Sequence, residues 1–197
     1  MSRKKKTPPV DFPELGQLEK ELAREKYKTR YGQVLRSTIY SLMAVAAAAI
    51  LVATLWLPLL QIYGSSMSPT LDEGQIVVSV KGGEMDTGDI VAFYYNNKIL
   101  VKRVIAGPGV WVDISEDGTV SLDGVEIDEP YLVEKAFGEC DITLPYQVPD
   151  GRWFLMGDHR STSVDSRSST VGCVSEEQIV GRIVFRLWPL SDFGGIE

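Results

Sequence analysis

Two short segments of this 197-residue chain contain side chains that together could support nucleophilic catalysis. The nucleophile segment, G-S-S-M-S-P-T-L (residues 64–71), carries Ser66, and the segment K-I-L-V-K-R-V-I-A-G-P-G (residues 98–109) carries Lys102. A serine hydroxyl attacks a carbonyl carbon when a nearby base takes its proton, and a neutral lysine amine can act as that base. Taken alone, a serine between Gly and Pro more often marks only a turn.

Lys102 would need an unusual environment to be neutral near pH 7. In an extended strand Leu100, Lys102 and Val104 share one face, so on an inward face the lysine would lie between two apolar neighbours. Desolvation disfavours the ammonium and lowers its pKa. The alternative is a lysine on an edge strand, where its charge guards the sheet against aggregation.

Two further segments could support such a site. The polar loop, M-G-D-H-R-S-T-S-V-D-S-R (residues 156–167), brings Asp158, Ser163, Asp165 and Arg167 close together in sequence. This density suits a hydrogen-bonded and ion-paired loop that supports a reacting centre, although a solvated turn has the same composition. The segment G-D-I-V-A-F (residues 88–93) is typical of a turn that enters a strand.

Composition argues against several other classes of protein. The chain has one histidine, His159, and two cysteines, Cys140 and Cys173, without the spacings of a zinc site, so we expect no metal and no cofactor. Residues 37–197 carry a net charge of −12, whereas nucleic-acid binding needs clustered positive charge. The cysteines could pair in an oxidising compartment or remain separate thiols.

A membrane-spanning helix is predicted near the N-terminus. No charged residue occurs from Ser37 to Leu71, and the apolar part runs from Ile39 to Leu60. About 20 helical residues span a bilayer core of ~30 Å. We therefore expect a basic cytoplasmic tail and charged helix at residues 1–36, a transmembrane helix at 37–60 and an extracytoplasmic domain at 61–197. A cleavable signal peptide is the alternative, although its apolar region and basic leader would be shorter.

The remainder of the chain is rich in β-branched and aromatic residues, which favour strands. We predict strands at residues 76–80, 89–95, 99–105, 152–156 and 178–187, and a hairpin within 120–127 that turns at Asp123-Gly124. The predicted fold class is mainly β: a curled antiparallel β-sheet catalytic domain behind one N-terminal transmembrane helix.

The four segments described above resemble, in their order along the chain and in their residue patterns, four segments of bacterial type I signal peptidases. The patterns of that family are G-x-S-M-x-P-T-L, G-D-[IV]-V-x-F, V-K-R-V-x-G-x-P-G and G-D-N-R-x-x-S-x-D-S-R. The stretch D-G-V-E-I-D-E-P-Y-L (residues 123–132) also resembles the connecting hairpin of that family. The resemblance covers about residues 37–187. It implies a single-pass bacterial membrane protein, a serine endopeptidase that cleaves signal peptides from exported preproteins after small residues in the A-x-A pattern. Preproteins and the lipid bilayer would be its partners, and the oligomeric state is left open.

The resemblance also implies roles for individual residues. Ser66 would be the nucleophile and would donate its backbone N–H to the oxyanion, while Lys102 would be the general base. Ser163 would hydrogen-bond and orient Lys102. The implied supporting residues are Asp158, Asp165 and Arg167, and the implied substrate pocket consists of Met67, Leu71, Leu100 and Val101.

Several positions depart from the family pattern. His159 stands where the family usually has Asn, Ser161 and Thr162 replace a common Asp-Asn pair, and Gly64 replaces a serine that in some members completes the oxyanion hole. Three alternatives therefore accompany the signal-peptidase interpretation. They are a Ser–His–Asp triad based on His159, a non-enzymatic membrane-anchored extracytoplasmic β-module, and a self-cleaving Ser–Lys peptidase, which would be cytosolic with a DNA-binding domain.

The charge distribution predicts the orientation of the chain in the bacterial cell membrane. Ten Lys and Arg precede the apolar segment, and none follows it before Lys81. Basic residues within about 15–20 positions of the membrane stay on the cytoplasmic side, so the N-terminus should be cytoplasmic and residues 61–197 outside. Protease added to intact spheroplasts should digest a C-terminal tag and spare an N-terminal tag. A protected C-terminal tag would contradict this orientation.

Overall fold

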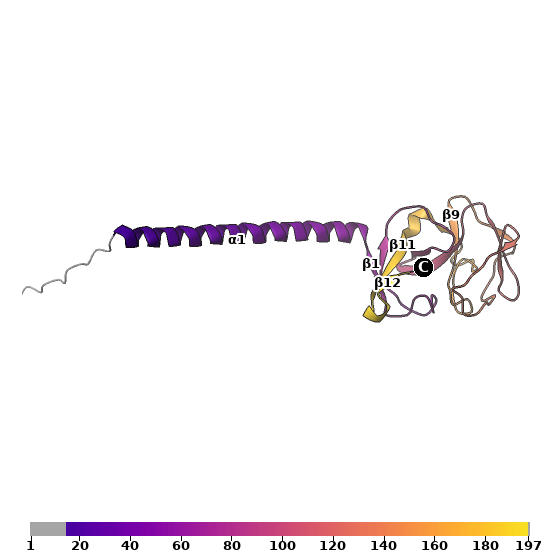
Figure 1. Cartoon of the computed structure of the whole chain (residues 1–197). Helices are drawn as coiled ribbons and strands as arrows, with labels where there is room; N and C mark the ends of the chain where they lie inside the picture. The colour runs from indigo at the N-terminus through magenta and orange to yellow at the C-terminus, as the bar shows by residue number, and fades with distance from the viewer. Residues whose placement is uncertain (1–14, 197) are drawn as a thin grey trace, which may run out of the picture. The chain divides into compact units, whose positions relative to one another are not determined.

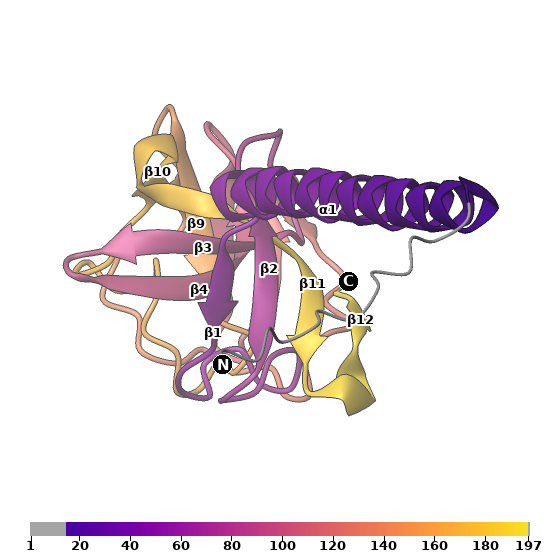
Figure 2. The same ribbon diagram turned by 90° about the vertical axis from the view of Figure 1, so that its left-hand side faces the viewer.

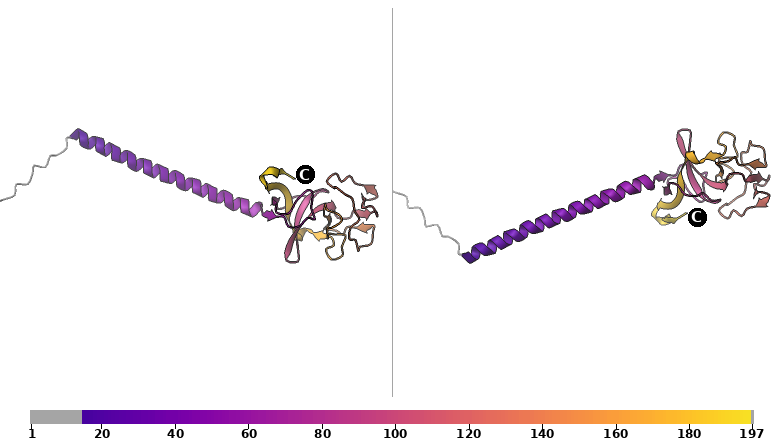
Figure 3. Two further views of the ribbon diagram at one scale, coloured as in Figure 1. Left: turned by 90° about the horizontal axis from the view of Figure 1, so that it is seen from below. Right: turned by 90° about the horizontal axis from the view of Figure 1, so that it is seen from above.

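The N-terminal helix α1 (Leu15–Trp56) runs without a break through the predicted charged and apolar segments (Figures 1 and 3). The computed structural model describes residues 15–196, which form one compact unit up to Leu51 and a second from Val52. The helix is long and apolar enough to cross a membrane. It ends four residues before the predicted end at residue 60, because Pro58 cannot continue a helix. The predicted tail before Leu15 lies outside the described residues.

The second unit contains two antiparallel sheets. The larger has the strand order β1-β2-β11-β3-β4-β9-β10, with β12 paired to β11, and Figure 2 shows β1, β2 and β11 side by side. Its strands are β1 (Leu59–Gln61), β2 (Ile76–Val80), β3 (Ile90–Tyr95), β4 (Lys98–Ala106), β9 (Arg152–Met156), β10 (Val174–Ser175), β11 (Ile179–Trp188) and β12 (Gly194–Gly195). The smaller has the order β7-β6-β5-β8, from β5 (Trp111–Ile114), β6 (Val120–Leu122), β7 (Val125–Glu126) and β8 (Tyr146–Gln147). Two 3₁₀ turns, Glu176–Gln178 and Leu190–Asp192, complete the unit.

The mainly antiparallel β architecture behind one apolar helix confirms the predicted fold class. The predicted hairpin is also confirmed: Asp123 and Gly124, with φ of 51° and 80°, join β6 to β7. Two consecutive residues at positive φ match the twist of a tight hairpin, which is why Asp-Gly is favoured there. The sequence did not reveal β1, β5, β8, β10 and β12, because strands of two to four residues are too short to set up an alternating pattern.

Hydrophobic side chains join the two sheets through one cluster and support the nucleophile segment through another. In the first, Ile105 and Phe154 of the large sheet pack with Val112 and Val120 of the small sheet. The second cluster takes in Ile62, Met67, Leu71, Val77, Ile90, Ala92 and Ile183. The nucleophile segment is therefore fixed to the large sheet by its own apolar side chains.

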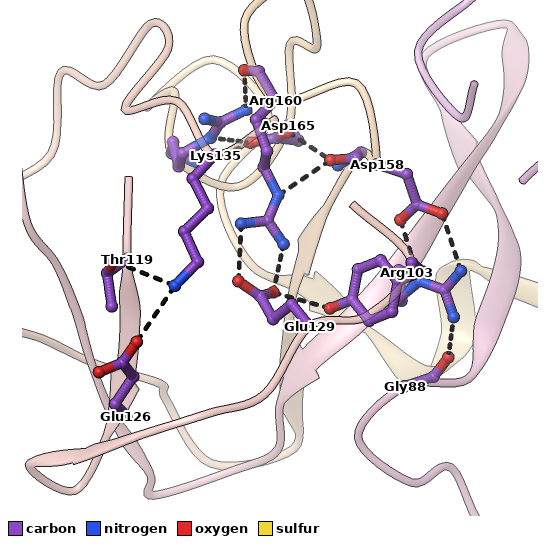
Figure 4. A network of polar contacts seen from close by, with 12 residues as sticks. Gly88, Arg103, Thr119, Glu126, Glu129, Lys135, Asp158, Arg160 and Asp165 are labelled. Carbon is purple, nitrogen blue, oxygen red and sulfur yellow. Dashed lines mark hydrogen bonds and ion pairs between the residues drawn. The ribbon is translucent and has the colours of Figure 1, made fainter. Parts of the chain in front are cut away.

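A segment that we call the strap (residues 128–138) leaves the small sheet after β7 and is bound to the polar loop by a buried ion pair. Arg160 donates to both carboxylate oxygens of Glu129, one hydrogen bond being 3.1 Å long, and both side chains are fully buried (Figure 4). Farther along the strap, Lys135 reaches Glu126 at 3.1 Å, and both of these side chains are exposed. The two ion pairs differ in burial and should differ in energy.

Glu129→Ala should therefore lower the free energy of unfolding by about 3–5 kcal/mol, because it leaves the Arg160 guanidinium buried without its counter-charge. Glu126→Ala is the matched control and should cost less than about 1 kcal/mol, since it removes an exposed pair. Chemical denaturation followed by tryptophan fluorescence measures both. Equal losses for the two variants would mean that the buried pair does not hold the strap.

Candidate active site

Ser66 lies on a tight turn whose next residues are anchored in the core. Met67 and Leu71 are almost completely buried, and the Leu71 N–H donates to the Met67 carbonyl at 2.9 Å. Gly64, at the start of the turn, has a φ of 79°, a conformation that side chains with a Cβ rarely adopt. The Ser66 N–H makes no hydrogen bond with any residue in the range 15–196. Ser66 is thus held at the rim of the core with a free backbone donor.

Lys102 lies on an internal strand, so the alternative of an edge-strand lysine is wrong. Its strand β4 is flanked by β3, where Lys102 pairs with Val91, and by β9. The side chain is only 3% exposed. Its Nζ donates a hydrogen bond of 2.7 Å to Ser66 Oγ. Segments 36 residues apart in the sequence thereby bring together a hydroxyl and a buried amine.

Burial is the largest cause and lowers the pKa of Lys102 to about 8. Asp165 raises the pKa, Arg167 lowers it and Asp158 raises it, in decreasing order of effect. Asp165 is itself paired with Arg167, and Asp158 with Arg103, so each of these carboxylates has a buried counter-charge of its own. A larger share of neutral amine is therefore present near pH 8 than for an exposed lysine.

Asp158 connects three segments of the site. Its carboxylate accepts hydrogen bonds from Arg103 Nε and Nη2, at 2.9 and 2.8 Å, and from Thr70 Oγ1 at 2.5 Å. Arg103 follows Lys102 on β4, and Thr70 belongs to the nucleophile segment. The Tyr131 ring of the strap lies 3.8 Å from the Arg103 guanidinium carbon. The strand that carries Lys102 and the nucleophile segment are thus bound to the same carboxylate.

Asp165 and Arg167 form a buried ion pair within the polar loop. Asp165 accepts from both Arg167 Nε and Nη2 at 2.9 Å and from the Gly157 N–H at 3.0 Å. Burial raises the pKa of Asp165, but the hydrogen bonds and charge of Arg167 outweigh it, so that the pKa is lowered overall. Arg167 also donates to the carbonyls of Phe137 and Arg160, at 2.7 and 2.9 Å. One ion pair therefore satisfies backbone groups of both the polar loop and the strap.

The predicted hydrogen bond from Ser163 to Lys102 is not formed in this structure. Ser163 Oγ is buried, makes no hydrogen bond to Lys102, and packs against Gly157. A Cβ at position 157 would lie 2.5 Å from the Ser66 carbonyl oxygen, so only glycine fits between them. The contact between the polar loop and Ser66 is a main-chain hydrogen bond: the His159 N–H donates to the Ser66 carbonyl at 3.1 Å.

The His159 imidazole does not take part in a triad. Its Nδ1 is buried without a partner, and no hydrogen bond within residues 15–196 joins the ring to Ser66 or to a carboxylate. Cys140 and Cys173 are separate thiols, and burial raises the pKa of Cys173 to about 11. Among the residues described, Lys102 is the side chain placed to take a proton from Ser66.

An apolar groove of about 790 Å³ opens beside Ser66. Its lining includes Met67, Leu100 and Val101, three of the four residues predicted for the substrate pocket. Leu71, the fourth, lies in the core beneath the groove, because it packs with Met67 one helical turn earlier in the chain. Leu60 and Ile62, which the sequence did not single out, complete the apolar wall.

The sequence also did not point to Thr70, Arg103, Glu129, Tyr131 and Arg160 as parts of the site. Arg160 and Glu129 are 31 residues apart, and no spacing rule connects them. The one available signal was the position of Arg103 directly after Lys102, since opposite faces of a strand alternate. If Lys102 faces one side of the sheet, Arg103 faces the other side, where a buried guanidinium needs a partner of opposite charge.

Residues 35–188 match the family described as "Signal peptidase, peptidase S26". Signal peptidase IB of Staphylococcus aureus (strain COL) is 39% identical over an alignment of 153 residues, which covers 67% of this chain and 78% of that protein. Signal peptidase I of Bacillus amyloliquefaciens is 37% identical over an alignment of 164 residues, which covers 77% of this chain and 83% of that protein. A β-domain with a buried lysine against a serine is thus found within the part of the chain that matches these peptidases. The chain belongs to the signal peptidase family, peptidase S26.

A solved structure is also similar in part. The crystal structure of a signal peptidase I from Enterococcus faecalis V583 covers 51% of this chain and 97% of that chain, with 29% sequence identity and a TM-score of 0.44.

Lys102→Met should stabilise the protein at neutral pH, since it removes a buried amine whose folded-state pKa of about 8 lies below its ordinary value of 10.5. Below about pH 8 the ammonium is charged in both states and the full cost of burying it applies, up to about 3 kcal/mol. The gain should shrink as pH rises from 8 and vanish above about 10.5. Denaturation of wild type and variant across this range measures it. Lys98→Met, at an exposed position of the same strand, is the control, and an equal pH dependence there would contradict the burial argument.

Proposed function

We propose that this protein is a membrane-bound serine endopeptidase that cleaves signal peptides from exported preproteins with a dyad of Ser66 and Lys102. The observation that carries the proposal is the 2.7 Å hydrogen bond between the buried Lys102 Nζ and Ser66 Oγ. Family membership supports the reaction class. A non-enzymatic membrane-anchored module would not need a desolvated amine against a serine hydroxyl.

The reaction follows from the positions of these groups. Neutral Lys102 takes the Ser66 proton while Oγ forms a bond to the scissile carbonyl carbon, and the Ser66 N–H faces the oxyanion that develops. The Lys102 ammonium then gives its proton to the leaving amine as the C–N bond breaks, which frees the mature chain. Lys102 next takes a proton from the water that attacks the acyl-enzyme. As the bond between the acyl carbon and Ser66 Oγ breaks, the Lys102 ammonium returns this proton to Oγ, which releases the signal peptide and restores both residues.

The apolar groove fits the N-terminal side of the scissile bond. Its walls of Met67, Leu100 and Val101 leave room beside Ser66 for small side chains, in agreement with the A-x-A pattern expected from the resemblance. We assign the −1 and −3 residues of the substrate to this groove. Anchoring by α1, with the domain outside the cell membrane, would bring Ser66 to the membrane face where signal peptides emerge.

Ser66→Ala and Lys102→Ala should each abolish cleavage of a preprotein in detergent, because each removes one partner of the proton transfer. We expect losses greater than about 100-fold in kcat/KM, in line with the effect of removing a general base. His159→Asn is the control within the site and should keep most of the wild-type activity, since the ring makes no hydrogen bond to Ser66 and the main-chain N–H that does so is unchanged.

Circular dichroism establishes that the variants fold. Substantial turnover by folded Ser66→Ala or Lys102→Ala would refute the dyad. A large loss of activity in His159→Asn would instead revive the triad.

A further inference from the structure

A second cavity, of about 220 Å³, lies next to the nucleophile and has no part in the proposed proton transfers. It is lined by residues from three segments that are far apart in the sequence: the nucleophile segment, the strap and the polar loop. The lining residues are Ser68, Pro69, Val133, Glu134, Ala136, Asp158, His159 and Ser161.

The cavity and the apolar groove both border the nucleophile segment, at neighbouring residues of the chain. The groove is lined by Ser66 and Met67, the cavity by the next two residues of the chain, and the two share no lining residue. Consecutive Cα atoms are about 3.8 Å apart, so Ser68 Cα lies within about 7.6 Å of Ser66 Cα. His159, whose N–H donates to the Ser66 carbonyl, also lines the cavity. At about 3.3 Å per residue, a peptide bound at Ser66 spans that distance in about three residues.

We propose, on the basis of the proposed function, that this cavity binds the first three residues of the mature chain and that Glu134 selects there for basic over acidic side chains. Asp158, also in the lining, is neutralised by Arg103. Glu134 is exposed and makes no ion pair within residues 15–196. The cavity therefore presents one unpaired carboxylate to the leaving half of the substrate.

The wall that carries Glu134 is fixed on both sides. Before it, Glu129 is bound to buried Arg160, and after it, Lys135 donates to Glu126 and to Thr119 at 3.1 and 3.2 Å (Figure 4). Ala136, the next residue, packs closely on Gly118: a Cβ at position 118 would lie 2.5 Å from the carbonyl carbon of Ala136. Val133, at 82% exposure, and Glu134 thus project from a braced segment. A braced wall holds its charge in one place, as a specificity subsite requires.

The test compares preproteins that carry a single Lys or Glu at position +1, +2 or +3 after the cleavage site. At one or more of these positions the wild-type full chain in detergent should have a kcat/KM about 2- to 5-fold higher for Lys than for Glu, the range of an exposed charge pair. Glu134→Gln should bring this ratio to about 1, and Glu134→Lys should invert it. Glu116→Lys makes the same change of net charge on an exposed turn outside the cavity and should keep the wild-type ratio. High salt should reduce the preference by screening it.

Two results would overturn the subsite. One is equal cleavage of the Lys and Glu substrates by wild type at all three positions, and the other is a Glu134→Lys variant that keeps the wild-type ratio. Both are measured on enzyme that still cleaves, so they leave the dyad untouched. Cleavage by Ser66→Ala, in contrast, would overturn the proposed function and with it the assignment of the cavity.

Discussion

The structure of this site depends on one unfavourable arrangement: the Lys102 amine is buried where an ammonium is poorly solvated. A lysine amine accepts a proton so readily in water that it is almost never free near pH 7, and only desolvation or neighbouring positive charge changes this. In this protein desolvation is the larger effect, and the two carboxylates that raise the pKa, Asp165 and Asp158, are each paired with a buried arginine. The ion pairs can therefore position the site without returning the amine to its charged form.

Several separate contacts fix the Lys102 amine and the Ser66 hydroxyl next to each other. Lys102 cannot move sideways, since β4 is hydrogen-bonded on both edges. Ser66 is held below by Met67 and Leu71 and across its carbonyl by the His159 N–H. Asp158 ties the two segments together through Arg103 (Figure 4) and Thr70. Gly157 permits this approach because any side chain there would meet the Ser66 main chain.

Local patterns in the sequence predicted much of the fold. The strands Ile76–Val80 and Arg152–Met156 agree with prediction to the residue, and Asp123-Gly124 forms the expected turn, because alternation and turn chemistry act within a few residues. The serine and the lysine were identified largely through resemblance, and their contact follows from sheet pairing that no local pattern encodes. Leu71 was assigned to the pocket although it lies in the core, and the bond expected from Ser163 is absent. Both errors concern the direction of a side chain, which depends on tertiary packing rather than on sequence spacing.

The central claim is that a neutral, buried Lys102 activates Ser66, and the pH dependence of kcat/KM for preprotein cleavage tests it most directly. Lys102 must be deprotonated to act, so activity should be low in acid and rise with unit slope through an apparent pKa of about 8, with a plateau above it. A profile that rises only near pH ~10.4, the value of an exposed lysine, would show that the base is an unperturbed amine. That result would contradict activation of Ser66 by a desolvated lysine.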